Sequence, residues 1–223
     1  MTNKENKKTG PVQITGLMKK KRLYFDGGMG TLLQEKGLKA GEAPESWNIS
    51  RPDDITAIHR AYIEAGSNIV TTNTFGINRL KFSNYKELIA AGITCAKAAA
   101  ADKEDVFVAF DMGPTGKLLE PLGDLAFEDA VSLFADNVRA AAEYGADLIL
   151  IETMNDSYET KAAVLAAKEN CSLPVFVTNV YDEGCHTMTG ADPAAMVAML
   201  EGLGADALGI NCSLGPDKML PSV

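Results

Sequence analysis

Three stretches of the chain share one pattern: EAGSNIVTTNT at 64–74, EYGADLILIET at 143–153 and GLGADALGINC at 202–212. The third residue of each stretch is a glycine that follows a helical pattern, and a small residue and Asn or Asp come next. A short run follows that is largely apolar in the second and third copies. The glycine suits the left-handed conformation that ends a helix, and such a run suits a strand buried on both faces of a parallel sheet. The pattern predicts a repeated helix–strand unit.

The rest of the chain continues the alternation of strands and helices. Ser50 and Asp53 resemble a capping pair at the start of the helix before the first copy. Apolar residues at 127, 131, 134, 138 and 141 share one helix face before the second copy. We expect further strands at 22–25, 106–110 and 175–180, and further helices near 84–101, 156–169 and 192–203. Strict alternation predicts parallel strands joined by right-handed crossovers.

Polar residues at the predicted strand ends favour a barrel over an open sheet. They follow most of the strands: Asp26, Asn73, Thr74, Asp111, Glu152, Thr153, Asn211 and Cys212. A barrel brings such ends to one central site, whereas an open sheet binds ligands at one switch point, usually with a Gly-rich phosphate loop. The DGGMG segment at 26–30 lacks the spacing of that loop. We predict an α/β fold, a (β/α)8 TIM barrel with about six strand–helix units present in residues 21–223, after a disordered tail at 1–20.

Composition narrows the class of protein. A formal charge of −9 argues against a surface for nucleic acid or for an anionic membrane. No apolar run approaches the roughly 20 residues of a membrane-spanning helix, and we see no secretory signal. The four cysteines show no disulfide spacing, so we expect a reduced, cytoplasmic protein.

Two acids and two amides are the candidate contacts for a substrate. Asp26 and Glu152 would either cap a helix and pair with a base, or hold an ammonium group, or act together as acid and base. Asn73 and Asn211 occupy equivalent positions at strand ends. Each alone would be a turn-former, but the shared register favours at least one of them facing a substrate.

Cys212 has three possible roles. It could fill the core, which is common for cysteine, or act as a nucleophile, although His59 lies in a helix away from the strand ends. It could also bind a metal ion, but zinc needs at least three protein ligands. Cys185 and His186 follow a strand at the correct end and could in principle join it.

Several ordered motifs resemble one known family. They are FDGGMGTLLQ at 25–34, PESWNISRPDDITAIHRAYIEAGSNIVTTNTFGINRLKF at 44–82, GPTG at 113–116, IETMND at 151–156 and GINCSLGP at 209–216. Together they resemble the homocysteine-binding module of cobalamin-dependent methionine synthases, within the zinc-dependent homocysteine S-methyltransferases. The resemblance runs from about residue 21 to the last residue, and it implies a (β/α)8 barrel.

The resemblance also implies a site. The family's zinc is held by a cysteine after strand six, which Cys212 matches, and by an adjacent cysteine pair after strand eight, which has no counterpart in this sequence. Asp26 and Glu152 match the acids that bind the homocysteine amino group, and Asn73 lies in a motif that lines the same pocket. Zinc converts a thiol to a thiolate that attacks a methyl group. The donor is methylcobalamin on another module, recharged from methyltetrahydrofolate.

The expected function is therefore zinc-dependent methyl transfer to homocysteine, giving methionine. We expect an incomplete module, weak or inactive alone, that works with corrinoid- and folate-binding modules or chains. One alternative is a non-catalytic binding or assembly fragment completed by another chain. Another is a homocysteine methyltransferase that uses betaine or S-methylmethionine.

Overall fold

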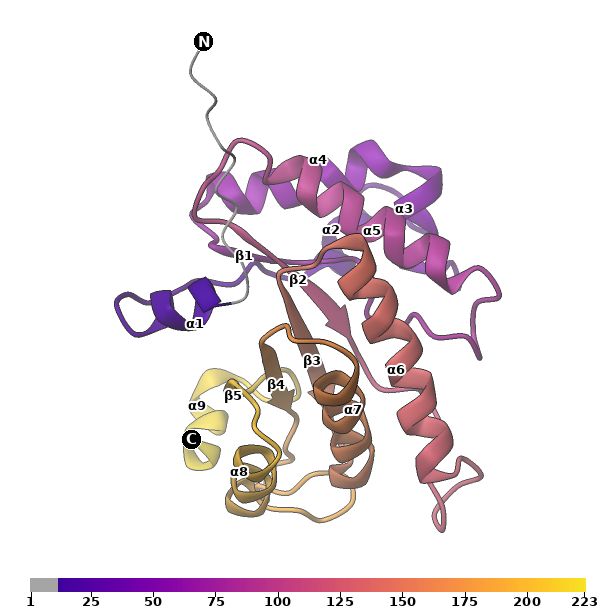
Figure 1. Ribbon diagram of the computed structural model, residues 1–223, viewed down its shortest axis with the longest axis vertical. Coiled ribbons are helices and arrows are strands. Elements are labelled where there is room, and N and C mark those ends of the chain that lie inside the picture. The colour runs from indigo at the N-terminus through magenta and orange to yellow at the C-terminus, as the bar shows by residue number, and fades with distance from the viewer. Residues whose placement is uncertain (1–11) are drawn as a thin grey trace.

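Five parallel strands form one sheet in the computed structural model, which describes residues 12–223 (Figure 1). The strands are β1 (Ile69–Thr71), β2 (Phe107–Met112), β3 (Leu148–Met154), β4 (Val175–Asn179) and β5 (Ala207–Ile210). Each strand pairs with its successor along the chain, in the order β1-β2-β3-β4-β5. A doubly wound sheet instead reverses its strand order at a switch point. The sequential order confirms the barrel type of α/β fold.

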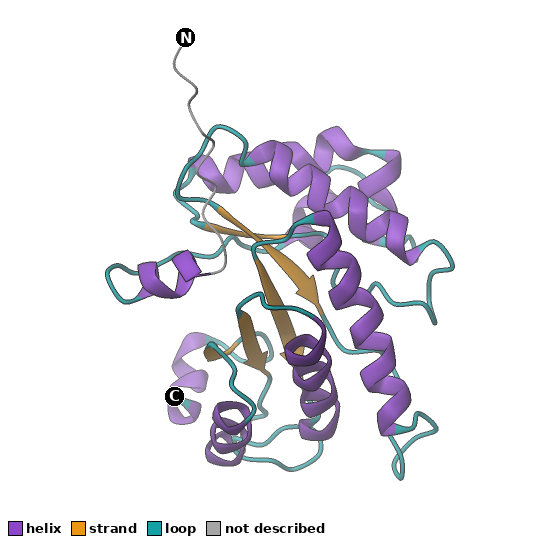
Figure 2. Ribbon diagram, viewed as in Figure 1, coloured by secondary structure: helices purple, strands orange, loops and turns teal. Residues whose placement is uncertain are grey.

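Helices cover the outer face of the sheet in an arc (Figure 2). Of the long ones, α4 (Pro52–Glu64) precedes β1, and four lie between successive strands: α5 (Tyr85–Ala99), α6 (Phe127–Tyr144), α7 (Ser157–Asn170) and α8 (Pro193–Gly202). Short ones complete the described chain: α1 (Val12–Met18), α2 (Met29–Glu35), η1 (Pro44–Ser46), α3 (Trp47–Ser50), α9 (Pro216–Met219) and η2 (Leu220–Ser222). The expected helices near 84–101, 156–169 and 192–203 correspond to α5, α7 and α8.

The sheet is strongly curled. Residues 22–25, predicted as the first strand, make a single parallel bridge, from Phe25 to Ile69 of β1. The ring of Phe25 nevertheless lies 6.4 Å from the ring of Phe176 on β4, centroid to centroid. Four strand spacings separate these positions, about 19 Å in a flat sheet. The two rings meet because the inner face is concave, although the barrel does not close within residues 12–223.

Two apolar layers stabilise this curl. Alternate strand residues such as Phe110 and Ile149 point outward against α5, α6 and α7. The others, including Phe107 and Leu148, point inward and contact Ile14 of α1, which is 1% exposed. Residues 12–18, predicted as part of a disordered tail, are thus helical, because burial of Ile14 at the start of the strands stabilises them. The first eleven residues of that predicted tail lie outside the described part.

The repeat itself fixes the spacing of the strands. Its three glycines, Gly66, Gly145 and Gly204, have φ of 111°, 80° and 77°, the left-handed conformation that the pattern predicts. The Asn or Asp two positions later bonds to the preceding strand through both its backbone and its side chain. Asp147, for example, donates its N–H to the Val108 carbonyl at 2.8 Å. Its Oδ2 atom accepts the Val108 N–H at 2.7 Å.

The same pair of hydrogen bonds, which we call a clamp, joins two other repeat residues to a neighbouring strand. Asn68 bonds in this way to Tyr24, and Asp206 bonds to Val175. Each clamp sets where one strand starts relative to its neighbour. The repeated stagger is what tilts parallel strands into a barrel.

Two smaller findings concern the helices. The predicted capping pair at Ser50 and Asp53 is wrong: Ser50 ends α3 and donates to the Ser46 carbonyl, and α4 begins at Pro52 without a side-chain cap. Pro52 has no N–H to be capped and already has the φ of a first helical residue. Within the described residues, no helix is long and apolar enough to cross a membrane.

The clamp predicts a stability effect. Asp147→Ala leaves the buried Val108 N–H without its side-chain acceptor, so we expect the free energy of unfolding in urea to fall by about 1–3 kcal/mol. Asp147→Asn keeps an acceptor oxygen and should lose clearly less. An alanine variant as stable as the wild type would show that the clamp does not hold the strands.

Candidate functional site

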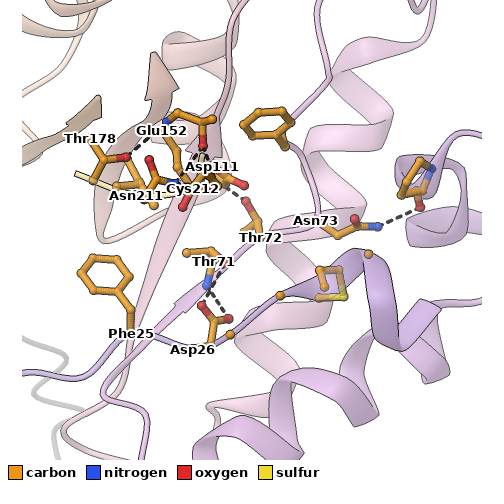
Figure 3. A pocket seen from close by; sticks show the side chains of 18 of the residues that line it. Phe25, Asp26, Thr71, Thr72, Asn73, Asp111, Glu152, Thr178, Asn211 and Cys212 are labelled. Atoms are coloured by element: carbon orange, nitrogen blue, oxygen red, sulfur yellow. Dashed lines mark hydrogen bonds between the residues drawn. The ribbon is translucent and has the colours of Figure 1, made fainter. Parts of the chain in front are cut away.

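A cavity of about 690 Å³ opens where the strands end (Figure 3). Its lining includes all five residues singled out from the sequence: Asp26, Asn73, Glu152, Asn211 and Cys212. They come from the loop after the first bridge, from β3 and from the segments that follow β1 and β5. The curl of the sheet therefore brings together side chains up to 186 positions apart in the sequence.

Asp26 is held firmly on one side of the cavity. Its carboxylate accepts the backbone N–H of Thr71 at 2.9 Å and the hydroxyl of Thr71 at 3.0 Å. Burial nonetheless raises the pKa of Asp26 to about 6. Near neutral pH this carboxyl is ionised and lies in a poorly solvated place, a suitable position for pairing with a cation.

Two further acids face the cavity from neighbouring strands. Asp111 lies on β2 and is 6% exposed, and Glu152 lies on β3. Burial, and then the charge of Glu152, raise the pKa of Asp111 well above its ordinary value. Burial also raises the pKa of Glu152, although a hydrogen bond from Asp111 works in the opposite direction.

Asp111 was among the predicted polar strand ends but was absent from the predicted substrate contacts. The sequence contained the signal, because Asp111 follows the apolar run VFVAF as Asp26 follows RLYF. What the sequence could not reveal is that the two positions share an inner face of the sheet.

The end of β3 is irregular where it meets β4. The register shifts between Ile151 and Met154, and Thr153 has a φ of 59°, which is unusual for a β-branched residue. Its N–H is held by the hydroxyl of Thr178 at 3.2 Å. Such a bulge redirects side chains at a sheet edge, and here Glu152 and Thr153 both line the cavity.

Cys212 lies at the rim, with its side chain exposed to solvent. The predicted alternative that it fills the core is therefore wrong; Cys95, which is 4% exposed, has that role. The amide of Asn211 donates to the Cys212 sulfur at 3.4 Å and to the Thr153 hydroxyl at 2.8 Å. The Thr153 hydroxyl is itself 3.7 Å from the sulfur. This contact orients the thiol over the mouth of the cavity.

Asn73 has a different setting from the other candidates. Its amide donates to the Pro44 carbonyl at 2.8 Å and to the Asn48 side chain at 2.9 Å. Figure 3 shows it directed away from the acids. Asn73 thus fastens the segment around Pro44 and Glu45, which also line the cavity, to the end of β1.

The described residues do not form a complete metal site. No three His, Cys, Asp or Glu side chains between residues 12 and 223 come together as a metal site. Cys185 and His186 therefore do not form such a group with Cys212, and His59 is fully buried in α4. Cys212 suits Zn²⁺ as a soft, accessible donor, but these residues do not make a complete zinc site.

Comparison with known proteins identifies the family. The model of the homocysteine S-methyltransferase protein family matches residues 23–223. The chain belongs to the homocysteine S-methyltransferase family. It is 32% identical to the methionine synthase of Mycobacterium leprae over 215 residues, which are 87% of this chain. It is 30% identical to the methionine synthase of Mycobacterium tuberculosis over 92% of this chain.

A solved structure shares the fold of this family member. The metallated form of the Escherichia coli homocysteine methyltransferase MmuM superposes with a TM-score of 0.80 at 22% identity, covering 91% of this chain and 78% of that one. Its apo form gives 0.75 at 24% identity, covering 91% and 76%. By contrast, the chain spans 18% and 19% of the lengths of the two methionine synthases.

The raised pKa of Asp26 predicts a pH dependence of stability. Because the pKa rises from 3.8 to about 6 on folding, the protonated form is favoured in the folded state. The stability that Asp26 contributes is full below pH 3.8 and is lost as the pH rises to about 6. Asp26→Asn should therefore gain stability relative to the wild type over this interval, by up to about 3 kcal/mol.

Urea unfolding at a series of pH values measures this gain. Asp102→Asn, an exposed change in the loop before β2, is the matched control. Parallel stability curves for the wild type and Asp26→Asn would contradict the raised pKa.

Proposed function

We propose that this chain binds homocysteine in the cavity and presents its thiol for methylation, the reaction that yields methionine. Membership of the homocysteine S-methyltransferase family supports a methyl transfer to this substrate. The observation that carries the proposal is that Asp26, Glu152 and Cys212 line one cavity. The substrate amino group and the substrate sulfur can then both be held within it.

In this proposal the acids bind the ammonium group of the substrate. Asp26 and Glu152 are half-buried, so a cation placed against them interacts through little water. The clamp of Thr71 on Asp26 fixes one carboxylate in advance, and the bulge at the end of β3 directs the other. A ligand held there at its amino end extends its side chain toward the rim that carries Cys212.

We assign Cys212 as one zinc ligand and Asn211 as a residue that orients it. Zn²⁺, when bound, supplies a lowered thiol pKa and hence a thiolate on the substrate. The described residues offer one such ligand and not three. Asn73 acts by holding the wall near Glu45, which accepts the Gly76 N–H at 2.8 Å.

Homocysteine binding tests the role of the acids. Glu152→Gln keeps the shape and removes the charge, so we expect the Kd measured by calorimetry to rise by about 10–100-fold. Glu201→Gln, an exposed change on α8, is the control and should leave the Kd unchanged. No binding by the wild type, or equal binding by Glu152→Gln, would refute the assignment.

Cobalt titration tests the role of Cys212. We expect Co²⁺ to bind the chain weakly and to give a sulfur-to-metal absorption band that Cys212→Ser removes, whereas Cys185→Ser keeps it. A band that survives in Cys212→Ser would exclude this residue as the ligand. Tight, stoichiometric zinc that depends on Cys212 would show that other ligands of this chain complete the site.

Methylcobalamin, held by another module and recharged from methyltetrahydrofolate, is the donor we propose. The likeness to two methionine synthases supports it over betaine or S-methylmethionine. Corrinoid- and folate-binding modules are then the partners.

The competing proposal, a binding or assembly fragment, predicts homocysteine binding without methyl transfer from free methylcobalamin. All four cysteines are free, which supports a reducing, cytoplasmic location.

A further inference from the structure

Asp111 is a further acid of the cavity, besides the two assigned to the ammonium group. Asp111 lies on β2, between the strand positions that lead to Asp26 and Glu152. Its side chain is 94% buried and lines the cavity. Its Oδ1 atom is buried and receives no hydrogen bond from a donor among the described residues.

A proton on one of the two neighbouring acids, Asp111 or Glu152, would let them bond to each other. Asp111 pairs with Leu150 in the register of β2 and β3, so Glu152, two residues further along β3, lies on the same inner face. Both side chains line the cavity, and they are close enough to interact. An ionised carboxylate only accepts hydrogen bonds, so two of them cannot bond to each other. A hydrogen bond between the two acids therefore needs a proton on one of them.

The surrounding charges favour the same state. The carboxyls of Glu152, Asp26 and Glu45 all act on Asp111, and all three raise its pKa, as burial does. Two interacting acids of this kind titrate as a pair rather than separately. The pair then holds its first proton far more tightly than an exposed carboxyl would.

We propose that Asp111 and Glu152 share one proton in the empty cavity and that a bound ammonium group displaces it. The statement rests on the proposed function for its ligand, a free α-amino acid. On binding, the O–H bond of the acid pair breaks and the proton passes to water. The ammonium N–H groups then donate to the carboxylates, and the added positive charge offsets the proton that left.

The exchange of a proton for an ammonium group makes Asp111 a positioning residue. Acting through Glu152, it selects ligands with a positively charged amino group. An amino acid whose nitrogen is acylated carries no positive charge and cannot displace the proton. The empty cavity meanwhile avoids the mutual repulsion of adjacent buried carboxylates.

Calorimetry with L-methionine measures the displaced proton. Methionine has the ammonium group but no ionisable thiol, so with EDTA-treated protein any released proton comes from the chain. Heats at pH 7 in buffers of different protonation enthalpy give the number released. Asp26, with a pKa of about 6, contributes about a tenth of a proton at this pH. We expect a total close to one.

Two variants assign the source of the proton. Asp111→Asn keeps a donor to Glu152 but has no proton to lose, so we expect binding with little proton release. Glu159→Gln changes an equally buried acid on α7 that bonds to Thr115 outside the cavity, and it should release as much as the wild type. Binding without release in the wild type, or equal release from Asp111→Asn, would overturn the proposal.

A second measurement needs neither the ligand nor a variant. Carboxyl ¹³C NMR of the free chain should show one acid of the pair still protonated at pH 7. If both are ionised there, the shared proton does not exist. If methionine fails to bind while the NMR shows the proton, the proposed function is wrong and the acid pair stands.

Discussion

The structure depends on one constraint: the pair of hydrogen bonds that joins the Asn or Asp of each repeat to the preceding strand. Asn68, Asp147 and Asp206 each give an N–H and accept one, so neighbouring strands cannot slide along one another. A slide of one residue would exchange the inner and outer faces of a strand. Asp111 and Glu152 would then point into the apolar layer beneath the helices, and the cavity would lose its charge.

Curvature converts this register into a site. With the strands staggered in the same sense, the inner face becomes concave and Phe25 meets Phe176 across it. The apolar half of the interior, at the strand starts, is filled by Ile14 and its neighbours. The polar half, at the strand ends, stays open and collects the acids. Stability and function thus occupy opposite ends of the same strands, as is general for this class of barrel.

The rim of the cavity near Cys212 has an unusual backbone. Thr153 and Cys212 both adopt left-handed backbone conformations, with φ of 59° and 57°. Such conformations are strained outside glycine and are concentrated at functional sites. Here they turn the thiol toward the cavity mouth and leave it exposed, while Asn211 bonds to both residues. A relaxed strand end would have alternated its side chains without regard to the cavity.

Much of this was readable from the sequence. The glycine repeat predicted the helix ends and the strands after them, because a left-handed residue and an apolar run are local signals. The polar strand ends predicted a shared site at Asp26, Glu152, Asn211 and Cys212. Motifs alone were sufficient to indicate the family. The helix ends, the strands and the family are confirmed, because each depends on neighbouring residues and on a repeating connection, whereas the shared site stays a prediction.

Other features were decided by contacts between distant segments. The sequence could not show that Asn73 bonds to Pro44 and Asn48, since these two residues reach it only through the fold. It could not show that residues 12–18 form a helix, because their burial needs the inner face of a curled sheet. Nor could it show that Asp111 lies beside Glu152, because the strand register sets which acids share an inner face. The fold also decides how deeply each acid is buried and which charges surround it. Sequence determined which residues stand at the strand ends; tertiary structure decided which of them face one another, because facing requires curvature and register together.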